Sequence, residues 1–108
     1  MALNINGTTG ISGVDGSASA PALQGTDSNT GINFGSDTVN INTGGSTRAT
    51  VDSAGALDVP TTFPIKVNGS EKLRIDSTGK LGLGITPTRP LHIASDEDLT
   101  SFTLSPNT

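Results

Sequence analysis

Gly45-Ser-Thr-Arg-Ala-Thr-Val-Asp-Ser-Ala-Gly-Ala-Leu57 and Gly69-Ser-Glu-Lys-Leu-Arg-Ile-Asp-Ser-Thr-Gly-Lys-Leu81 follow one pattern without gaps, at a single fixed offset that takes Gly45 to Gly69. Gly, Ser, Asp, Ser, Gly and Leu are identical at equivalent positions, and Arg48 and Val51 correspond to Lys72 and Ile75. Self-similarity at a fixed period is typical of repeat architectures. The sequence therefore predicts two copies of one small structural unit.

Each copy is predicted to form three short strands. In the second copy, apolar and polar residues alternate on both sides of Asn68-Gly69, which is a strong hairpin signal. The following Asp76-Ser-Thr-Gly79 predicts another turn, in which Asp bonds the turn backbone and Gly tolerates positive φ. The first copy has corresponding turns at Gly44-Gly45 and at residues 52–55. Strict alternation places all apolar residues of a copy on one face of an antiparallel meander.

Such a meander cannot bury a single apolar face alone. Either the two copies pack on each other within one chain, or three chains each contribute a wall around a shared axis. We favour three chains, because 14 Gly, three Phe, no Trp, no Tyr and no Cys supply a monomeric core poorly. The fold class expected is all-β, with short antiparallel meanders and extended segments assembled as an elongated, intertwined homotrimer. Its predicted core consists of Val39, Ile41, Val51, Leu57, Val59, Ile65, Val67, Leu73, Ile75, Leu81 and Leu83.

Four regions are expected along the chain. Residues 1–38, rich in Gly, Ser, Thr, Asn and Asp, read as an extended N-terminal arm, and an arm of this kind is ordered only against a partner. Residues 39–60 and 61–84 are the two repeats. Residues 85–108 read as a proline-broken linker, a strand at 91–93, an acidic turn at 96–98 and a further strand at 99–104. The isolated apolar residues of the arm, expected to dock on a partner, are Leu3, Ile5, Ile11, Val14 and Leu23.

Composition argues against several classes of partner. Six Lys and Arg against ten acidic residues give a net charge of −4, so no basic stripe is present for nucleic acid. No apolar run approaches the roughly 20 residues of a membrane span. The first residues do not form a secretory signal pattern. We expect neither a nucleic-acid partner nor a membrane partner.

No catalytic set stands out either. Gly82-Leu-Gly84 lacks the remainder of a phosphate loop, so its glycines read as turn residues. Asp52 and Asp76 read as turn caps rather than paired glycosidase carboxylates, and 96–98 as a solvated turn rather than a calcium loop. His92 is the single imidazole, and three copies of it around an axis are the one metal alternative. We predict no catalytic, cofactor or metal residues, no small-molecule substrate and no enzyme.

One further stretch, Gly79-Lys-Leu-Gly-Leu-Gly-Ile-Thr-Pro-Thr-Arg-Pro-Leu-His-Ile93, resembles the recurrent shaft segment of bacteriophage tail fibres and tail spikes. In that segment a Gly-rich run is followed by Thr/Ser-Pro and then by a Leu-His-Val/Ile strand. Residues 71–79 resemble the strand and turn that lead into it. Residues 25–32 and 37–45 are similar to fibre proteins of marine phages, cyanophages among them. The resemblance covers roughly residues 25–93.

The resemblance implies a homotrimeric, elongated β-structured protein of the virion, made in the host cytoplasm. The expected role is the N-terminal part of a tail fibre, which attaches through its arm to the tail or an adaptor protein and begins the shaft that supports host recognition. A capsid decoration or head fibre protein is the alternative. A glycan-binding adhesin ranks lower, because sugar platforms normally use Trp and Tyr, and the chain has neither.

Overall fold

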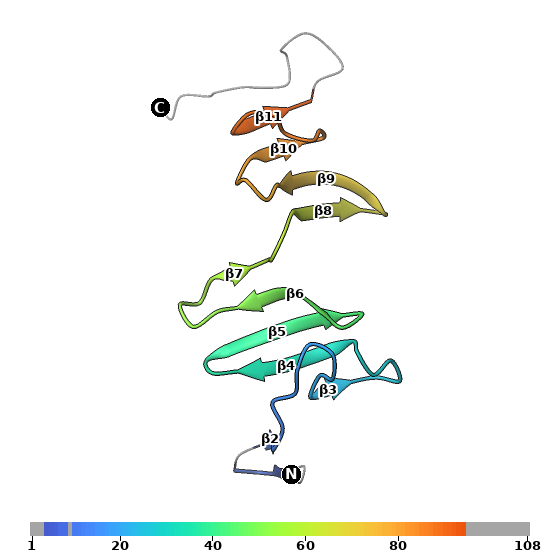
Figure 1. The fold of residues 1–108 in the computed structure, drawn as a ribbon, viewed down its shortest axis with the longest axis vertical. Coiled ribbons are helices and arrows are strands. Elements are labelled where there is room, and N and C mark those ends of the chain that lie inside the picture. Colours follow the sequence, from blue (N-terminus) through green and yellow to red (C-terminus); the bar gives the residue numbers. More distant parts are fainter. Residues whose placement is uncertain (1–3, 9, 95–108) are drawn as a thin grey trace. The chain divides into compact units, whose positions relative to one another are not determined.

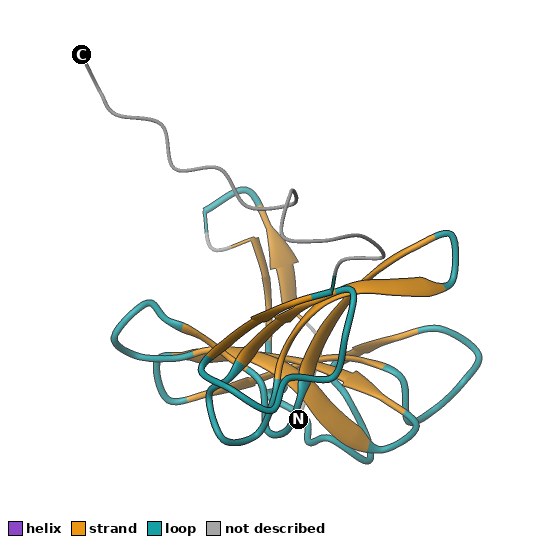
Figure 2. Cartoon of the chain, turned by 90° about the horizontal axis from the view of Figure 1, so that it is seen from above, coloured by secondary structure: helices purple, strands orange, loops and turns teal. Residues whose placement is uncertain are grey.

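The computed structural model describes residues 4–8 and 10–94, and every regular element in that part of the chain is a β-strand. Figure 2 shows strands and loops only. The chain divides into two compact units, Met1–Pro60 and Thr61–Thr108, called here the first and the second unit. The all-β prediction is confirmed for the described residues. Leu3, the acidic turn at 96–98 and the strand expected at 99–104 lie outside them.

The first unit contains two antiparallel sheets (Figure 1). The smaller sheet is a hairpin of β1 (Asn4–Asn6) and β2 (Gly10–Ser12). The larger sheet consists of β3 (Leu23–Gln24), β4 (Gly31–Gly35), β5 (Thr38–Thr43), β6 (Ser46–Val51) and β7 (Leu57–Asp58). Its strands lie side by side in sequence order, so the chain advances from one sheet edge to the other.

The second unit contains one four-stranded sheet (Figure 1). Its strands are β8 (Phe63–Val67), β9 (Ser70–Ile75), β10 (Leu81–Leu83) and β11 (Leu91–Ile93), again in sequence order. β8, β9 and β10 pair antiparallel, whereas β11 pairs parallel to β10. The strand at 91–93 is therefore confirmed, and its parallel pairing is a feature that the sequence pattern did not predict.

The two units repeat each other in detail at the offset that takes Gly45 to Gly69. Both predicted hairpin turns are present, with φ of 58° and 77° at Gly44 and Gly45 and of 48° and 78° at Asn68 and Gly69. Two consecutive positive φ values define the type I′ turn that matches strand twist. The register shifts after Ile41 in the β5–β6 pair and after the equivalent Ile65 in the β8–β9 pair, which leaves Arg48 and Lys72 as the extra residues. The repeat seen in sequence is thus a repeat of backbone geometry.

The second turn of each repeat is organised by an aspartate. Asp52 Oδ1 accepts hydrogen bonds from the backbone N–H groups of Ala54 and Ala56, both at 2.9 Å. Asp76 Oδ1 accepts the equivalent bonds from Thr78 and Lys80, at 2.9 and 3.0 Å. These carboxylates satisfy turn donors that the sheet leaves unpaired, as an Asx-type turn requires. The interpretation of both acids as turn residues is confirmed.

The parallel pairing of β10 and β11 depends on Gly82. Parallel neighbours usually need a connection of about a dozen residues or more, yet residues 84–90 return the chain here. A Cβ atom on Gly82 would collide with the carbonyl oxygen of Ile85 and lie 2.9 Å from Pro87 Cδ. The missing side chain lets the connection cross directly over β10, where Pro87 is buried.

The larger sheet of the first unit begins earlier in the chain than the sequence pattern indicates. β4 lies within the region 1–38 assigned to an extended arm, yet it pairs along its whole length with β5. Gly-Ile-Asn-Phe-Gly offers only two apolar residues between glycines, and Gly and Asn have low strand propensity. Pairing with β5, and not the local sequence, makes this segment a strand.

Candidate assembly surface on two apolar sheet faces

The first unit has one face made of apolar side chains, called here the first apolar face. Residues directly opposite each other on neighbouring strands point to the same side of a sheet. The register across β3–β7 therefore forms two apolar rows. The first row is Leu23, Ile32, Ile41 and Ala49, and the second row is Phe34, Val39, Val51 and Leu57.

The second unit has an equivalent face, called here the second apolar face. Its register also forms two rows across β8–β11. The first row is Ile65, Leu73, Leu83 and Ile93, and the second row is Phe63, Ile75, Leu81 and Leu91. The period-2 pattern of the sequence thus produces in both units a stripe of apolar side chains, two wide on every strand except the short edge strands β3 and β7, which contribute one each.

Neither apolar face is covered by the chain's own described residues. No described Ala, Val, Ile, Leu or Phe side chain is buried. Val39, Ile41 and Val51 are 41–49% exposed in the first unit, as are Ile65 and Ile75, at 45 and 42%, in the second. Soluble monomers rarely expose contiguous apolar patches of this extent, and such patches mark interaction sites.

All eleven residues predicted as a trimer core are described, and none of them is buried. Val39, Ile41, Val51, Leu57, Ile65, Val67 and Ile75 are exposed, and Val59, Leu73, Leu81 and Leu83 are half-buried. Nine belong to the apolar rows. Val67 continues the same side of β8, and Val59 follows the end of β7. The predicted core residues thus lie on the two apolar faces or next to them, open to a partner.

Several members of the rows were missed in the sequence. Ile32 and Phe34 belong to β4, which was not expected to join the sheet, and Leu91 and Ile93 depend on the parallel pairing of β11. Phe63 was detectable, because the repeat offset takes Val39 to it, and it lies opposite Ile75 as Val39 lies opposite Val51. Extending the repeat alignment toward the N-terminus would have identified it.

The opposite face of the first unit is closed by amides and hydroxyls. Asn42 is 1% exposed and Asn33 7%, and Asn42 Nδ2 donates to Asn33 Oδ1 at 2.7 Å. Thr47 Oγ1 donates to Asn42 Oδ1 at 2.9 Å, and Thr50 Oγ1 to Asn40 Oδ1 at 2.7 Å. Buried polar groups are tolerable when they are paired in this way. The buried side of this sheet is therefore its polar side.

The opposite face of the second unit carries charge. Arg74 Nε and Nη2 donate to both carboxylate oxygens of Glu71, and the second of these bonds is 2.7 Å long. The hydrogen bonds from Arg74 lower the pKa of Glu71. The same bonds raise the pKa of Arg74. His92 lies on this face opposite Gly82, and its Nδ1 accepts a bond from the Thr88 backbone N–H at 3.3 Å.

The sheet edges are poor surfaces for adding a further strand. In the first unit the edge strands β3 and β7 are two residues long. In the second unit the edge strand β11 is three residues long, and the edge strand β8 contains Pro64 and Lys66. Short edges, proline and lysine are the devices by which proteins prevent edge-to-edge pairing. The apolar faces, rather than the edges, are the surfaces available for association.

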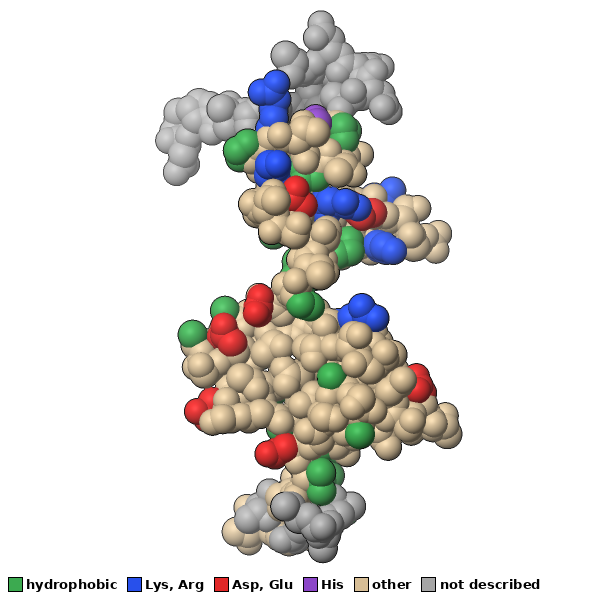
Figure 3. Space-filling view, in the orientation of Figure 1, with side chains coloured by type: hydrophobic (Ala, Val, Ile, Leu, Met, Phe, Trp, Pro, Cys, Tyr) green, Lys and Arg blue, Asp and Glu red, His purple; other side chains and the backbone are tan. Residues whose placement is uncertain are grey.

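Charged side chains stay out of the apolar rows. The first unit contains five acidic residues and one basic residue, Arg48. The described part of the second unit contains five basic residues and two acidic ones, and Figure 3 shows this difference on its visible face. No row contains an ionisable residue, so a partner that covers only the rows buries no charge. Arg48 Nε donates to Thr43 Oγ1 at 2.8 Å, beside the end of the first apolar face.

The residues predicted to dock on the virion are also exposed where they are described. Ile5 and Ile11 pair across the β1–β2 hairpin and are 68 and 65% exposed. Val14 follows this hairpin, and Leu23 is the first member of an apolar row. The described members of this set come from a hairpin, a loop and the sheet, and three of them, Ile11, Val14 and Leu23, line one cavity.

Among residues 4–8 and 10–94, no group of three or more His, Cys, Asp or Glu side chains is placed to hold a metal ion. The same residues contain no helix long and apolar enough to cross a membrane. Comparison with protein family models, with curated proteins and with solved structures gives no match for this chain.

Proposed function

We propose that this chain is a structural component of a virus particle, the N-terminal part of a trimeric bacteriophage tail fibre that begins a β-structured shaft. One observation carries the proposal. The larger sheet of the first unit and the sheet of the second unit each present an apolar face, and no described aliphatic or aromatic side chain is buried on either face. The tail location is supported by the resemblance of residues 71–93 to fibre shafts and of residues 25–45 to phage fibre proteins. The role is mechanical, attaching at one end and extending toward the other.

The free energy of removing apolar side chains from water favours covering these faces with a partner. Nine large aliphatic side chains on them remain 41–60% exposed: Leu23, Val39, Ile41, Val51, Leu57, Ile65, Val67, Ile75 and Leu91. Full burial of such a side chain contributes about 1.5–3 kcal/mol, so covering nine half-exposed ones contributes on the order of 10 kcal/mol before the entropy of association is subtracted. An isolated chain lacks that contribution.

A second copy of the same chain is the partner that fits. A partner that covers both units must present two apolar stripes with the same strand spacing and the same repeat offset. The chain itself has that periodicity. In a cyclic assembly, symmetry places the same strands of each copy next to one another, so the apolar stripes of the copies meet in register.

Three copies suit the width of the stripe. Every strand of the two faces except β3 and β7 contributes two apolar side chains, which lie about 7 Å apart along a strand. Two such narrow stripes facing each other leave both flanks open to water, whereas three stripes around an axis close each other's flanks. The aliphatic side chains and few aromatics suit a narrow axial core. Within each unit, the sequential strand order suits a chain that advances along such an axis.

Sedimentation equilibrium of the full chain tests the assembly. We expect a species of three times 10.8 kDa at micromolar concentration, and a folded monomer would overturn the proposal. Antibody labelling of assembled particles under the electron microscope tests the location. Label on the tail fibres supports the proposal, and label on the capsid surface would replace the tail fibre by a head decoration protein.

A further inference from the structure

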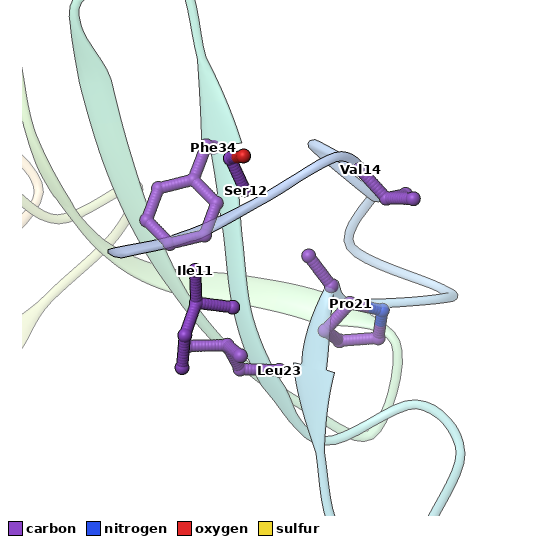
Figure 4. A pocket seen from close by; sticks show the side chains of 7 residues that line it. Ile11, Ser12, Val14, Pro21, Leu23 and Phe34 are labelled. Atoms are coloured by element: carbon purple, nitrogen blue, oxygen red, sulfur yellow. The ribbon is translucent and has the colours of Figure 1, made fainter. Parts of the chain in front are cut away.

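The first unit contains an apolar cavity at the β3 end of the first apolar face. Its volume is about 360 Å³, and its walls include Ile11, Ser12, Val14, Pro21, Leu23 and Phe34. Figure 4 shows the Phe34, Ile11 and Leu23 side chains following one another along one wall. Apart from the Ser12 hydroxyl, these side chains are apolar. The cavity therefore suits aliphatic or aromatic groups better than a charged or sugar ligand.

The cavity is continuous with the first apolar face. Leu23 lies opposite Ile32 in one apolar row, and Phe34 lies opposite Val39 in the other. Both side chains thus belong to the cavity wall and to the surface proposed to meet other copies. Any sheet that covers the rows also brings its own apolar side chains to the cavity.

We infer that this cavity is filled by apolar side chains of a second copy of the chain, so that residues 11–14 belong to the self-association surface. This inference rests on the proposed assembly. It reassigns Ile11 and Val14, which the sequence places among residues docking on another virion protein. An apolar void of this size at an interface would leave its lining without contacts, and filling it recovers them. A neighbouring copy held against Leu23 and Phe34 is already adjacent to it.

The β1–β2 hairpin supplies a matched pair of variants. Ile5 and Ile11 are directly opposite each other, are the same residue type and are exposed to a similar degree, but only Ile11 lines the cavity. We expect Ile11→Asn to raise the concentration at the midpoint of association by about fivefold to tenfold. Ile5→Asn should change it less than about twofold. Sedimentation equilibrium of both full-length variants measures the shift.

A second wall position repeats the test. Because Val14 is 53% exposed, Val14→Asn should leave the fold intact and weaken association as Ile11→Asn does; circular dichroism checks both proteins. If wild type assembles and both cavity variants assemble equally well, the inference is overturned and the cavity is left to another virion protein. Equal weakening by Ile5→Asn and Ile11→Asn also overturns it, since the hairpin as a whole would then be responsible. A monomeric wild type overturns the proposed function itself.

Discussion

The two units of the chain share one face and differ in the other. At the repeat offset, Val39, Ile41, Val51 and Leu57 correspond to Phe63, Ile65, Ile75 and Leu81 in the same register. On the opposite face, the amide pair of Asn33 and Asn42 has no equivalent, because the second unit has Lys66 and the Glu71–Arg74 ion pair there. In each unit, side chains of the same unit form the hydrogen bonds on this polar face. The apolar face is the feature that both units retain, which indicates that it performs the common task.

The largest expected effect comes from placing a charge on the shared face of either unit. Val51→Asp and its equivalent Ile75→Asp would each bury an unpaired carboxylate in the assembly, weakening association at least about a hundredfold. Light scattering at micromolar concentration measures the loss. Lys80→Asp, in a turn outside the rows, is the control. Normal assembly of both face variants would refute association through the apolar faces, and weakening by only one of them would refute the equivalence of the two faces.

The polar faces should respond differently from one another. Asn42→Ala removes a buried amide that bonds Asn33 and Thr47, leaving their polar groups unsatisfied at a cost of about 1–3 kcal/mol. The equivalent change in the second unit, Lys66→Ala, alters an exposed side chain and should stay within about 0.5 kcal/mol. Urea denaturation at a fixed protein concentration compares them. Equal costs would contradict the difference between the two polar faces.

Gly82 sharpens the comparison at a single position. Gly82→Ala places a methyl group against the carbonyl of Ile85 and the ring of Pro87, and such overpacking costs about 1–3 kcal/mol. Its equivalent in the first unit, Asp58, is exposed, so Asp58→Ala should be nearly neutral. Amide hydrogen exchange should show faster exchange at Ala94, whose N–H donates to the Leu83 carbonyl across β10–β11. Unchanged exchange there would exclude the close crossing.

The smallest expected effect is the response of the Asp76 turn to low pH. Backbone N–H from Lys80, then the Thr78 hydroxyl and N–H, lower the pKa of Asp76. A carboxylate whose pKa is lowered by folding stabilises the fold above its ordinary value of about 4, and that contribution disappears as pH falls through the lowered value. The Thr78 and Lys80 amide resonances should therefore move only below about pH 4. A midpoint above the ordinary value would contradict the bonding described, and Asp76→Asn provides the baseline.

The sequence predicts those parts of the fold that depend on neighbouring residues. Hairpins at Gly44-Gly45 and Asn68-Gly69 and the aspartate turns follow from local backbone preferences, and alternation predicts the rows. Burial of Asn42 was not predictable in this way, because its amide partner lies in another strand. The parallel return of β11 was missed because it depends on contact between Gly82 and a loop later in the chain.

Reactivity of single cysteines tests most directly whether other copies cover the apolar faces. The chain contains no cysteine, so Ile41→Cys and its equivalent Ile65→Cys each introduce one thiol on a face, and Ser53→Cys and Ser77→Cys place equivalent thiols on exposed turns. After normalisation to the rates in denaturant, we predict that both face thiols react at least about tenfold more slowly than the turn thiols. Equal rates at all four positions would show that the faces stay open to solvent, and would contradict assembly through them.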